Sequence, residues 1–264
     1  IDRKLTDAEI EETVKYCKSD VYNTMEVFMK TINEFNAVVN LIKTFELPAS
    51  YISKTKAQLS AIILGCNRHN WNDEFDITIV DTLRIGKYKP ILEWFNKKTF
   101  YDESFEFDVA GVKHTFGIGG VHGAKENYHS KGLIIHVDVT SYYPSLMIYY
   151  NFLSRAMPIE GKRKFINMYF GRRKVKARNG EELQVVIDEE IEFYKTHPHY
   201  GEYDSTYNDS LDKEHHKADK KKSQILKLPL NTTYGCEKAK FNDMYDPHNS
   251  NNVCISGQLM LMAL

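Results

Sequence analysis

The surroundings of Asp138 in the sequence suggest chemistry. The residue comes at the end of an apolar run, Gly-Leu-Ile-Ile-His-Val-Asp at 132–138, and Tyr-Tyr-Pro follows at 142–144. The run predicts a buried β-strand over 133–139, and the proline predicts a helix that starts close to it. A carboxylate at the end of a buried strand is costly unless it binds a cation or is well hydrogen-bonded. We interpret this turn as a candidate metal–phosphate site, with a turn-initiating aspartate as the structural alternative.

A second pattern lies in Ile-Leu-Lys-Leu-Pro-Leu-Asn-Thr-Thr-Tyr-Gly at 225–235. Lys227, Asn231 and Tyr234 are spaced i, i+4 and i+7, so a helix would place a cation, an amide and a ring on one face. Pro229 should kink or weaken this helix, and Gly235 suits its end. A surface helix that ends at a glycine is the structural alternative.

A third pattern is a concentration of charge. Residues 155–178 contain nine Lys or Arg and one acid, Glu160, whereas residues 181–214 contain eleven acids. Arg172 and Lys176 are four apart, so on a helix they would repel each other unless an anion lay between them. A solvated basic face and a phosphate-binding face both account for this spacing.

Together and in their order along the chain, the three patterns resemble motifs of the family B DNA polymerases, most closely those of bacteriophages. Asp138-Val-Thr-Ser-Tyr-Tyr-Pro-Ser-Leu is similar to motif A, and Lys227-Leu-Pro-Leu-Asn-Thr-Thr-Tyr-Gly235 is similar to motif B. Phe116-Gly-Ile-Gly-Gly120 is similar to the family's template-contacting glycine loop. Tyr16-Cys-Lys-Ser-Asp20 is similar to its third exonuclease motif, with ring and carboxylate on one helix face.

The resemblance implies a DNA-directed DNA polymerase that adds deoxynucleotides to a primer 3′ end, with two Mg²⁺ ions as cofactors and primer–template DNA and deoxynucleoside triphosphates as partners. It implies these site residues: Asp138 as catalytic and metal-binding carboxylate, with the Val139 carbonyl as a further ligand; Ser141, Tyr142, Tyr143, Arg172, Lys176, Lys227 and Asn231 for the nucleotide; Gly119, Gly120, Tyr234 and Gly235 for DNA; and Tyr16 and Asp20 as an exonuclease remnant. Tyr143 matches the ring that excludes ribonucleotides.

Several elements must position these residues. Apolar spacing predicts helices over 7–46 and 54–65 and in the last residues of the chain, and alternation predicts a strand over Phe75–Leu83. Residues 105–123 are typical of strand and turn. We therefore expect an α+β fold: 1–47 as an exonuclease remnant, 48–115 as a linking region, 116–155 as the first part of a palm, 156–235 as fingers and 236–264 as the second part of the palm.

The composition limits the classes of protein to which this chain can belong. The 264 residues carry a net charge of −1, so no global basic signature points to nucleic acid. The four cysteines are dispersed, which predicts reduced thiols, and no apolar run is long enough to span a membrane, so we expect a soluble, cytoplasmic protein, in the host cell if phage-encoded. The chain begins without Met and ends within a helical pattern, so we expect a fragment that lacks motif C and polymerises at a negligible rate alone.

Two other functions remain open. One is a non-catalytic DNA-binding module that keeps a polymerase-like shape. The other is a metal nuclease centred on Asp20 and Asp76, although no further carboxylate motif accompanies them. We interpret Asn72-Asp-Glu-Phe-Asp76, which has the spelling of the second exonuclease motif, as a coincidence because it follows Asp20 instead of preceding it.

Overall fold

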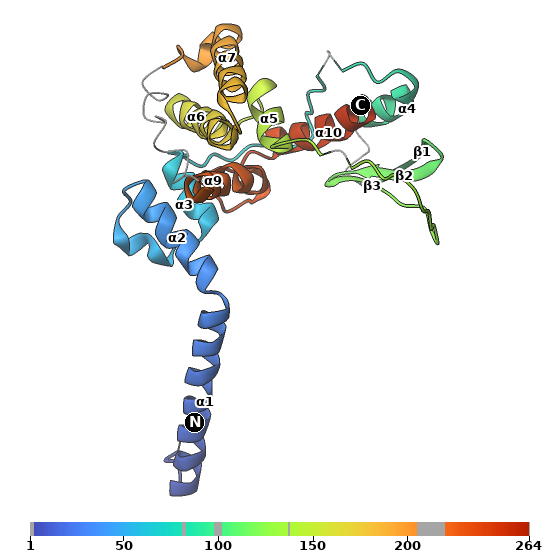
Figure 1. Ribbon diagram of the computed structural model, residues 1–264. Coiled ribbons are helices and arrows are strands. Elements are labelled where there is room, and N and C mark those ends of the chain that lie inside the picture. Colours follow the sequence, from blue (N-terminus) through green and yellow to red (C-terminus); the bar gives the residue numbers. More distant parts are fainter. Residues whose placement is uncertain (1–2, 81–82, 98–101, 137, 205–219, 264) are drawn as a thin grey trace. The chain divides into compact units, whose positions relative to one another are not determined.

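The computed structural model describes residues 3–80, 83–97, 102–136, 138–204 and 220–263. The chain divides into two compact units, Ile1–Thr55 and Lys56–Leu264. It combines helices with one three-stranded antiparallel sheet, which agrees with the expected α+β class (Figure 1). Within the described ranges, no helix has both the length and the apolar character needed to cross a membrane.

The first unit is helical, as its sequence predicts. It contains α1 (Asp7–Lys30), α2 (Ile32–Thr44) and the short η1 (Ala49–Ser53). Helix α1 begins with a capping box, in which the Thr6 side chain and the Glu9 side chain each accept the other residue's backbone N–H. None of its 24 residues is buried. Thr31, which is not predicted as a break, separates α1 from α2.

The second unit holds most of the helices. These are α3 (Lys56–Ile63), η2 (Gly86–Tyr88), α4 (Lys89–Asn96), α5 (Tyr142–Tyr149), α6 (Ile159–Lys176), α7 (Gly180–Thr196), η3 (Pro198–Tyr200), α9 (Lys220–Lys238) and α10 (Pro247–Ala263). The predicted helices at 54–65, near Pro144, around Arg172 and at the end of the chain are all confirmed. Helix α9 continues past Gly235 to Lys238, so the expectation that Gly235 ends it is wrong.

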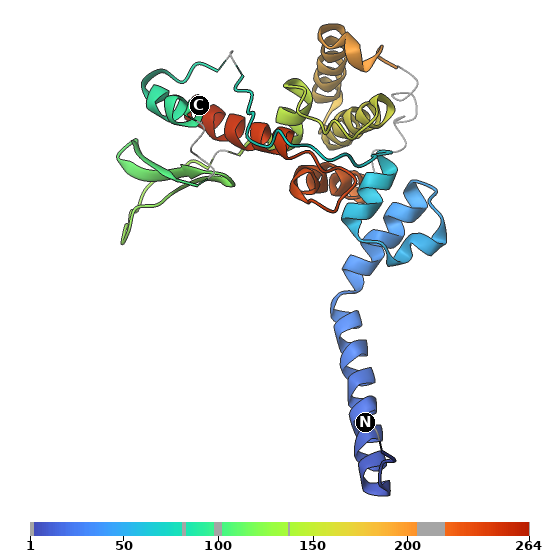
Figure 2. The same ribbon diagram turned by 180° about the vertical axis from the view of Figure 1, so that it is seen from behind.

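The sheet consists of β1 (Phe105–Val109), β2 (Val112–Gly117) and β3 (Gly120–Gly123), in that order, which confirms the strands expected over 105–123. Phe105 pairs with Phe116, and Gly117 pairs with Gly120. A core joins the sheet to α4 and α10, which lie beside each other in Figures 1 and 2. Its buried members are Ile85, Ile91, Trp94, Phe95, Phe116, Ile255 and Leu259.

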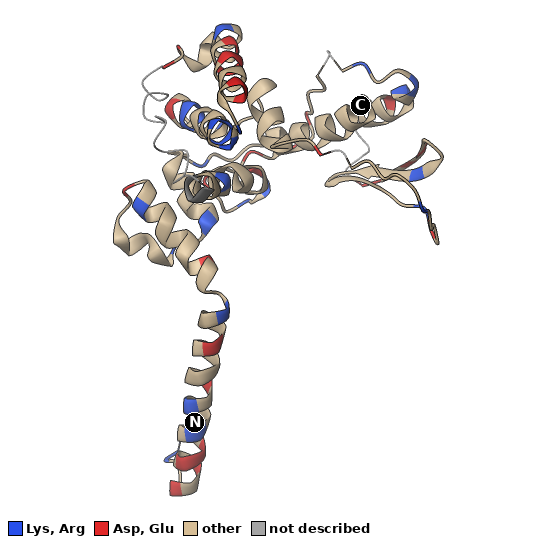
Figure 3. Ribbon diagram, in the orientation of Figure 1, with Lys and Arg blue, Asp and Glu red and all other residues tan. Residues whose placement is uncertain are grey.

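Helices α6 and α7 are joined through opposite charges (Figure 3). Arg173 donates two hydrogen bonds of 2.7 Å to the carboxylate of Glu189. Lys174 pairs with Glu190, and both side chains are almost completely buried. The basic and acidic stretches of the sequence are therefore partly used for packing, and only part of the basic face of α6 is left for other partners.

Two predicted strands are wrong. Residues 133–136 and 138–139 are irregular, and Leu133, Ile134 and Ile135 are 92%, 83% and 77% exposed, while Val137 lies outside the described residues. A strand needs a neighbour for its backbone groups, and none of the strands in the described ranges pairs with this run. The described part of 75–83 is also irregular, because the Thr78 N–H donates to the Asn252 side chain (2.7 Å) instead of to a ladder.

Candidate functional site

The turn before α5 is held in an unusual backbone conformation. Ser141 has φ 55° and ψ 42°, in the left-handed region that residues with a side chain rarely adopt. Its carbonyl accepts hydrogen bonds from the Ser145 N–H (2.9 Å) and the Ser145 hydroxyl (3.0 Å). The turn therefore leads straight into a helix whose first residues are Tyr142 and Tyr143.

Arg172 joins α6 to this turn. Its Nη1 donates a 2.9 Å hydrogen bond to the hydroxyl of Ser141, although the two residues are 31 apart in the sequence. Arg172 is only 9% exposed, its Nε has no acceptor among the described residues, and burial lowers the pKa of its guanidinium. A buried cation that lacks a carboxylate partner is expensive, and a bound anion would relieve that cost.

Tyr143 of α5 and Tyr234 of α9 form a stacked pair. Their ring centroids are 4.4 Å apart and the planes are inclined by 8°. Burial raises the pKa of both hydroxyls, so both rings stay neutral at physiological pH. The residues identified from motif A and motif B of the resemblance therefore touch each other.

Lys176 and Lys227 place two more cations close to Arg172. Desolvation lowers the pKa of the Lys176 amine, and the charges of Arg172 and Lys227 lower it further. Lys227, Asn231 and Gly235 are exposed along α9. A cavity of about 650 Å³ lies at the junction of α6, α7 and α9, and Lys176, Arg178 and Ser223 contribute to its wall.

Helix α10 contributes residues that sequence reasoning missed. The Gly119 N–H donates to the Cys254 sulfur (3.2 Å), and Gln258 both accepts from the Gly117 N–H (3.3 Å) and donates to the Gly117 carbonyl (2.9 Å). Cys254 and Gln258 are four apart, so a helical face was the available signal. Gly119 has φ 118° and Gly120 φ 150°, values that suit glycine in this hairpin turn.

The same helix also holds the start of α5. The Tyr142 hydroxyl donates a 2.6 Å hydrogen bond to the Gly257 carbonyl. A Cβ at Gly257 would lie 3.3 Å from Leu146, so a larger residue would press on α5. Helix α10 thus fixes both the glycine hairpin and the tyrosine turn.

Asp138 and Val139 do not have the setting expected of them. Both are exposed in an irregular segment, so the buried strand end that motivated the metal interpretation is absent. Among the described residues, no group of three or more His, Cys, Asp or Glu side chains could hold a metal ion. Asp138 therefore offers one carboxylate and no complete metal centre.

The remaining predicted residues, Tyr16 and Asp20, lie on α1 in the other unit, where both are exposed. Their spacing of four residues puts them on one face of that helix, as the sequence predicts.

Comparisons with models of protein families, with curated proteins and with solved structures found no match to this chain.

Proposed function

We propose that this chain is part of a DNA-directed DNA polymerase of the family B type, which adds deoxynucleotides to a primer 3′ end. The observation that supports this most strongly is the meeting of three sequence-distant segments. Tyr143 stacks on Tyr234 at 4.4 Å, and Arg172 donates to Ser141 at 2.9 Å, so the turn at 140–143, the end of α6 and the exposed face of α9 share one location. A random assortment of surface residues would not bring together the segments that the resemblance relates.

Each group has a physical role in this proposal. Arg172, Lys176 and Lys227 bind the triphosphate, because three neighbouring cations repel one another until an anion is bound. The backbone N–H groups of the turn at Ser141 and Tyr142 add donors to the same phosphates. Tyr143 stands against the sugar, and Tyr234 and Asn231 stand against the nascent base pair. In this proposal α5 and α10 belong to the palm, and α6, α7 and α9 to the fingers.

The two magnesium ions of this reaction are only partly accounted for. Asp138 is exposed and can supply one carboxylate, but the described residues contain no group of three or more His, Cys, Asp or Glu side chains that could hold a metal ion. The resemblance implies a second catalytic aspartate in motif C, and the 264 residues contain no such motif. The 264 residues alone are therefore expected to bind substrates without extending a primer above background.

The test is nucleotide-dependent binding of DNA. The purified chain is titrated into a fluorescein-labelled primer–template in Mg²⁺ buffer, with and without the deoxynucleoside triphosphate that pairs with the next template base. We expect the correct triphosphate to tighten binding and Arg172→Ala to reduce that effect by roughly 10-fold or more, because one charge-assisted hydrogen bond is removed. Arg84→Ala, at an exposed arginine just before η2 and outside this site, is the matched control.

Two results would contradict the proposal. Binding that depends on salt but not on any triphosphate would favour a non-catalytic DNA-binding module. Equal losses in Arg172→Ala and Arg84→Ala would show that the cations act only as general positive charge. A chain that extends the primer by itself would contradict the expected need for a second carboxylate.

A further inference from the structure

A second concave surface lies between residues 68–75 and the segment that follows α9. The cavity has a volume of about 800 Å³, and its wall includes Arg68, Asn70, Trp71, Phe75, Lys240 and Tyr245. None of these residues belongs to the site built around Ser141 and Arg172. Glu74 is the one carboxylate in the wall, so the lining has a net charge of +1 in a chain whose overall charge is −1.

The wall combines flat rings with cations. Trp71 and Tyr245 are half-buried and Phe75 is exposed, so all three rings present surface to water. Arg68 and Lys240 are exposed. Burial and the nearby Glu74 charge raise the pKa of the Tyr245 hydroxyl, so this ring stays neutral at physiological pH. Phe241, directly after Lys240, is 89% exposed. Large rings are normally buried, so this accumulation in water suggests a partner with flat apolar faces.

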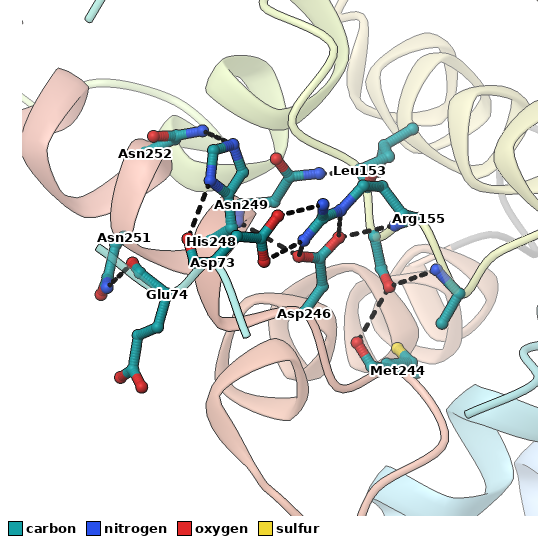
Figure 4. Close-up of polar contacts among 12 residues, drawn as sticks. Asp73, Glu74, Leu153, Arg155, Met244, Asp246, His248, Asn249, Asn251 and Asn252 are labelled. Carbon is teal, nitrogen blue, oxygen red and sulfur yellow. Dashed lines mark hydrogen bonds and ion pairs between the residues drawn. The ribbon is translucent and has the colours of Figure 1, made fainter. Parts of the chain in front are cut away.

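Arg155 packs against the Trp71 ring and belongs to a network of charged side chains, which Figure 4 shows around Asp73 and Asp246. The Arg155 guanidinium lies 4.0 Å from the indole centroid. Arg155 donates to Asp73 at 2.6 and 3.0 Å and to Asp246 at 2.7 and 3.0 Å. Because the arginine is held by two carboxylates, it supports the ring as a rigid platform and is not itself available to a ligand.

Residues 73–78 are attached to α10 by side-chain amides. Asn251 donates to the Glu74 carbonyl (2.8 Å), and His248 contacts the Asp73 carbonyl (3.3 Å) and the Asn252 amide (2.9 Å). The segment has no regular secondary structure, so these bonds, with the Thr78 bond to Asn252, give it a defined path. Because the loop is already fixed in this way, ligand binding to its rings does not require a further loss of conformational entropy.

We propose that this surface binds single-stranded nucleic acid, with bases stacked on the rings and phosphates bound by Arg68 and Lys240. Rings interleaved with cations on an open surface are the combination that binds unpaired bases without sequence preference. The amides of Asn70 and Asn72 can donate to or accept from base edges. The inference concerns a different surface from the proposed polymerase site, and it holds whether or not the chain catalyses anything.

The experiment uses the tryptophan itself as the reporter. The chain has two tryptophans, and Trp94 is 6% exposed in the core. Quenching of tryptophan fluorescence by an oligonucleotide would therefore come from a base stacked on Trp71. A fluorescein-labelled (dT)16 strand, without primer, triphosphate or metal, is titrated and followed by anisotropy, and the unlabelled strand by tryptophan fluorescence. We expect binding with quenching, and Trp71→Phe should abolish the quenching while anisotropy still reports binding.

Charge variants test the phosphate contacts. The double variant Arg68→Glu with Lys240→Glu should weaken binding at least 10-fold and reduce the slope of log K against log salt by roughly 1.4, about 0.7 for each lost contact. Lys97→Glu, an exposed lysine just after α4, is the matched control and should stay within twofold. Phe241→Ala, at a side chain too exposed to affect folding, should weaken binding about fivefold or more.

Three results would overturn the inference. They are an absence of quenching with wild-type chain, equal losses in the double variant and in Lys97→Glu, and a 16-base-pair duplex that binds as tightly as the single strand. Arg172→Ala separates this site from the polymerase site, because it should remove the triphosphate effect on primer–template binding and leave the quenching by (dT)16 in place.

Discussion

The buried pair of Lys174 and Glu190 gives the sharpest prediction about stability. The side chains are 2% and 3% exposed, so each charge has lost almost all its hydration. Dehydration lowers the pKa of Lys174 and raises that of Glu190, both opposite to what their mutual attraction would cause. The cost of burial therefore exceeds the attraction, and the pair orders α6 against α7 without adding net stability.

Removing one partner should be far worse than removing both. Glu190→Gln removes the carboxylate that pairs with the buried Lys174 ammonium, and the expected loss is about 3–5 kcal/mol. For a unit of this size that corresponds to a fall in melting temperature of roughly 6–20 °C. Replacing both residues by methionine removes both charges at similar volume, and the double variant should equal the parent or exceed it by about 1–4 kcal/mol.

The assay is urea unfolding at neutral pH followed by far-ultraviolet circular dichroism. The parent, the two single methionine variants and the double methionine variant form a double-mutant cycle and are measured together with Glu190→Gln. Glu192→Gln is the matched control, because Glu192 pairs with Lys195 at 3.6 Å while both side chains are about two-thirds exposed. The control should change stability by less than about 1 kcal/mol. Additive losses in the methionine double variant, or a Glu190→Gln loss no larger than the control's, would refute this account.

Three further predictions follow. Arg155 lowers the pKa of Asp73, so this carboxylate stabilises the fold at neutral pH and the contribution is lost as the pH falls below about 4; acid titration of Asp73→Asn should lack that loss. Gln258→Ala removes both hydrogen bonds to Gly117, so hydrogen exchange at the Gly117 amide, measured by NMR, should accelerate at least fivefold, as about 1 kcal/mol per bond implies. Tyr143→Ala should reduce the preference for dTTP over UTP in the primer–template assay by up to roughly 100-fold, and an unchanged preference would remove Tyr143 from the sugar pocket.

The helices could be predicted from the sequence because the signals for a helix are local. The apolar spacing over 7–46 has the period of a helix, and that signal lies within the segment itself. The hairpins at 105–123 could be assigned for the same reason, since alternation and paired glycines are local features. Lys227, Asn231 and Tyr234 lie on one helix as their spacing predicts.

Features that depend on partners far away in the sequence could not be predicted from the sequence. The apolar pattern at 133–139 predicts a strand whether or not another strand is present to pair with it. The exposure of these residues could therefore not be predicted from the pattern. A glycine such as Gly235 is common at the end of a helix. In α9 it does not adopt the left-handed backbone conformation that ends a helix, and α9 continues to Lys238. The supports from Cys254 and Gln258 depend on how α10 meets the hairpin, which no spacing in a single segment encodes.

The exposed aliphatic residues at 133–135 make aggregation of the purified chain an expected problem. Leu133, Ile134 and Ile135 are three consecutive exposed aliphatic residues on a backbone that none of the described strands pairs with, and such a segment favours intermolecular cross-β association. Clouding on concentration, and fibrils seeded from this segment, are the behaviour to expect in storage. A lysine placed at Ile134, in the middle of the stretch, is the simplest gatekeeper.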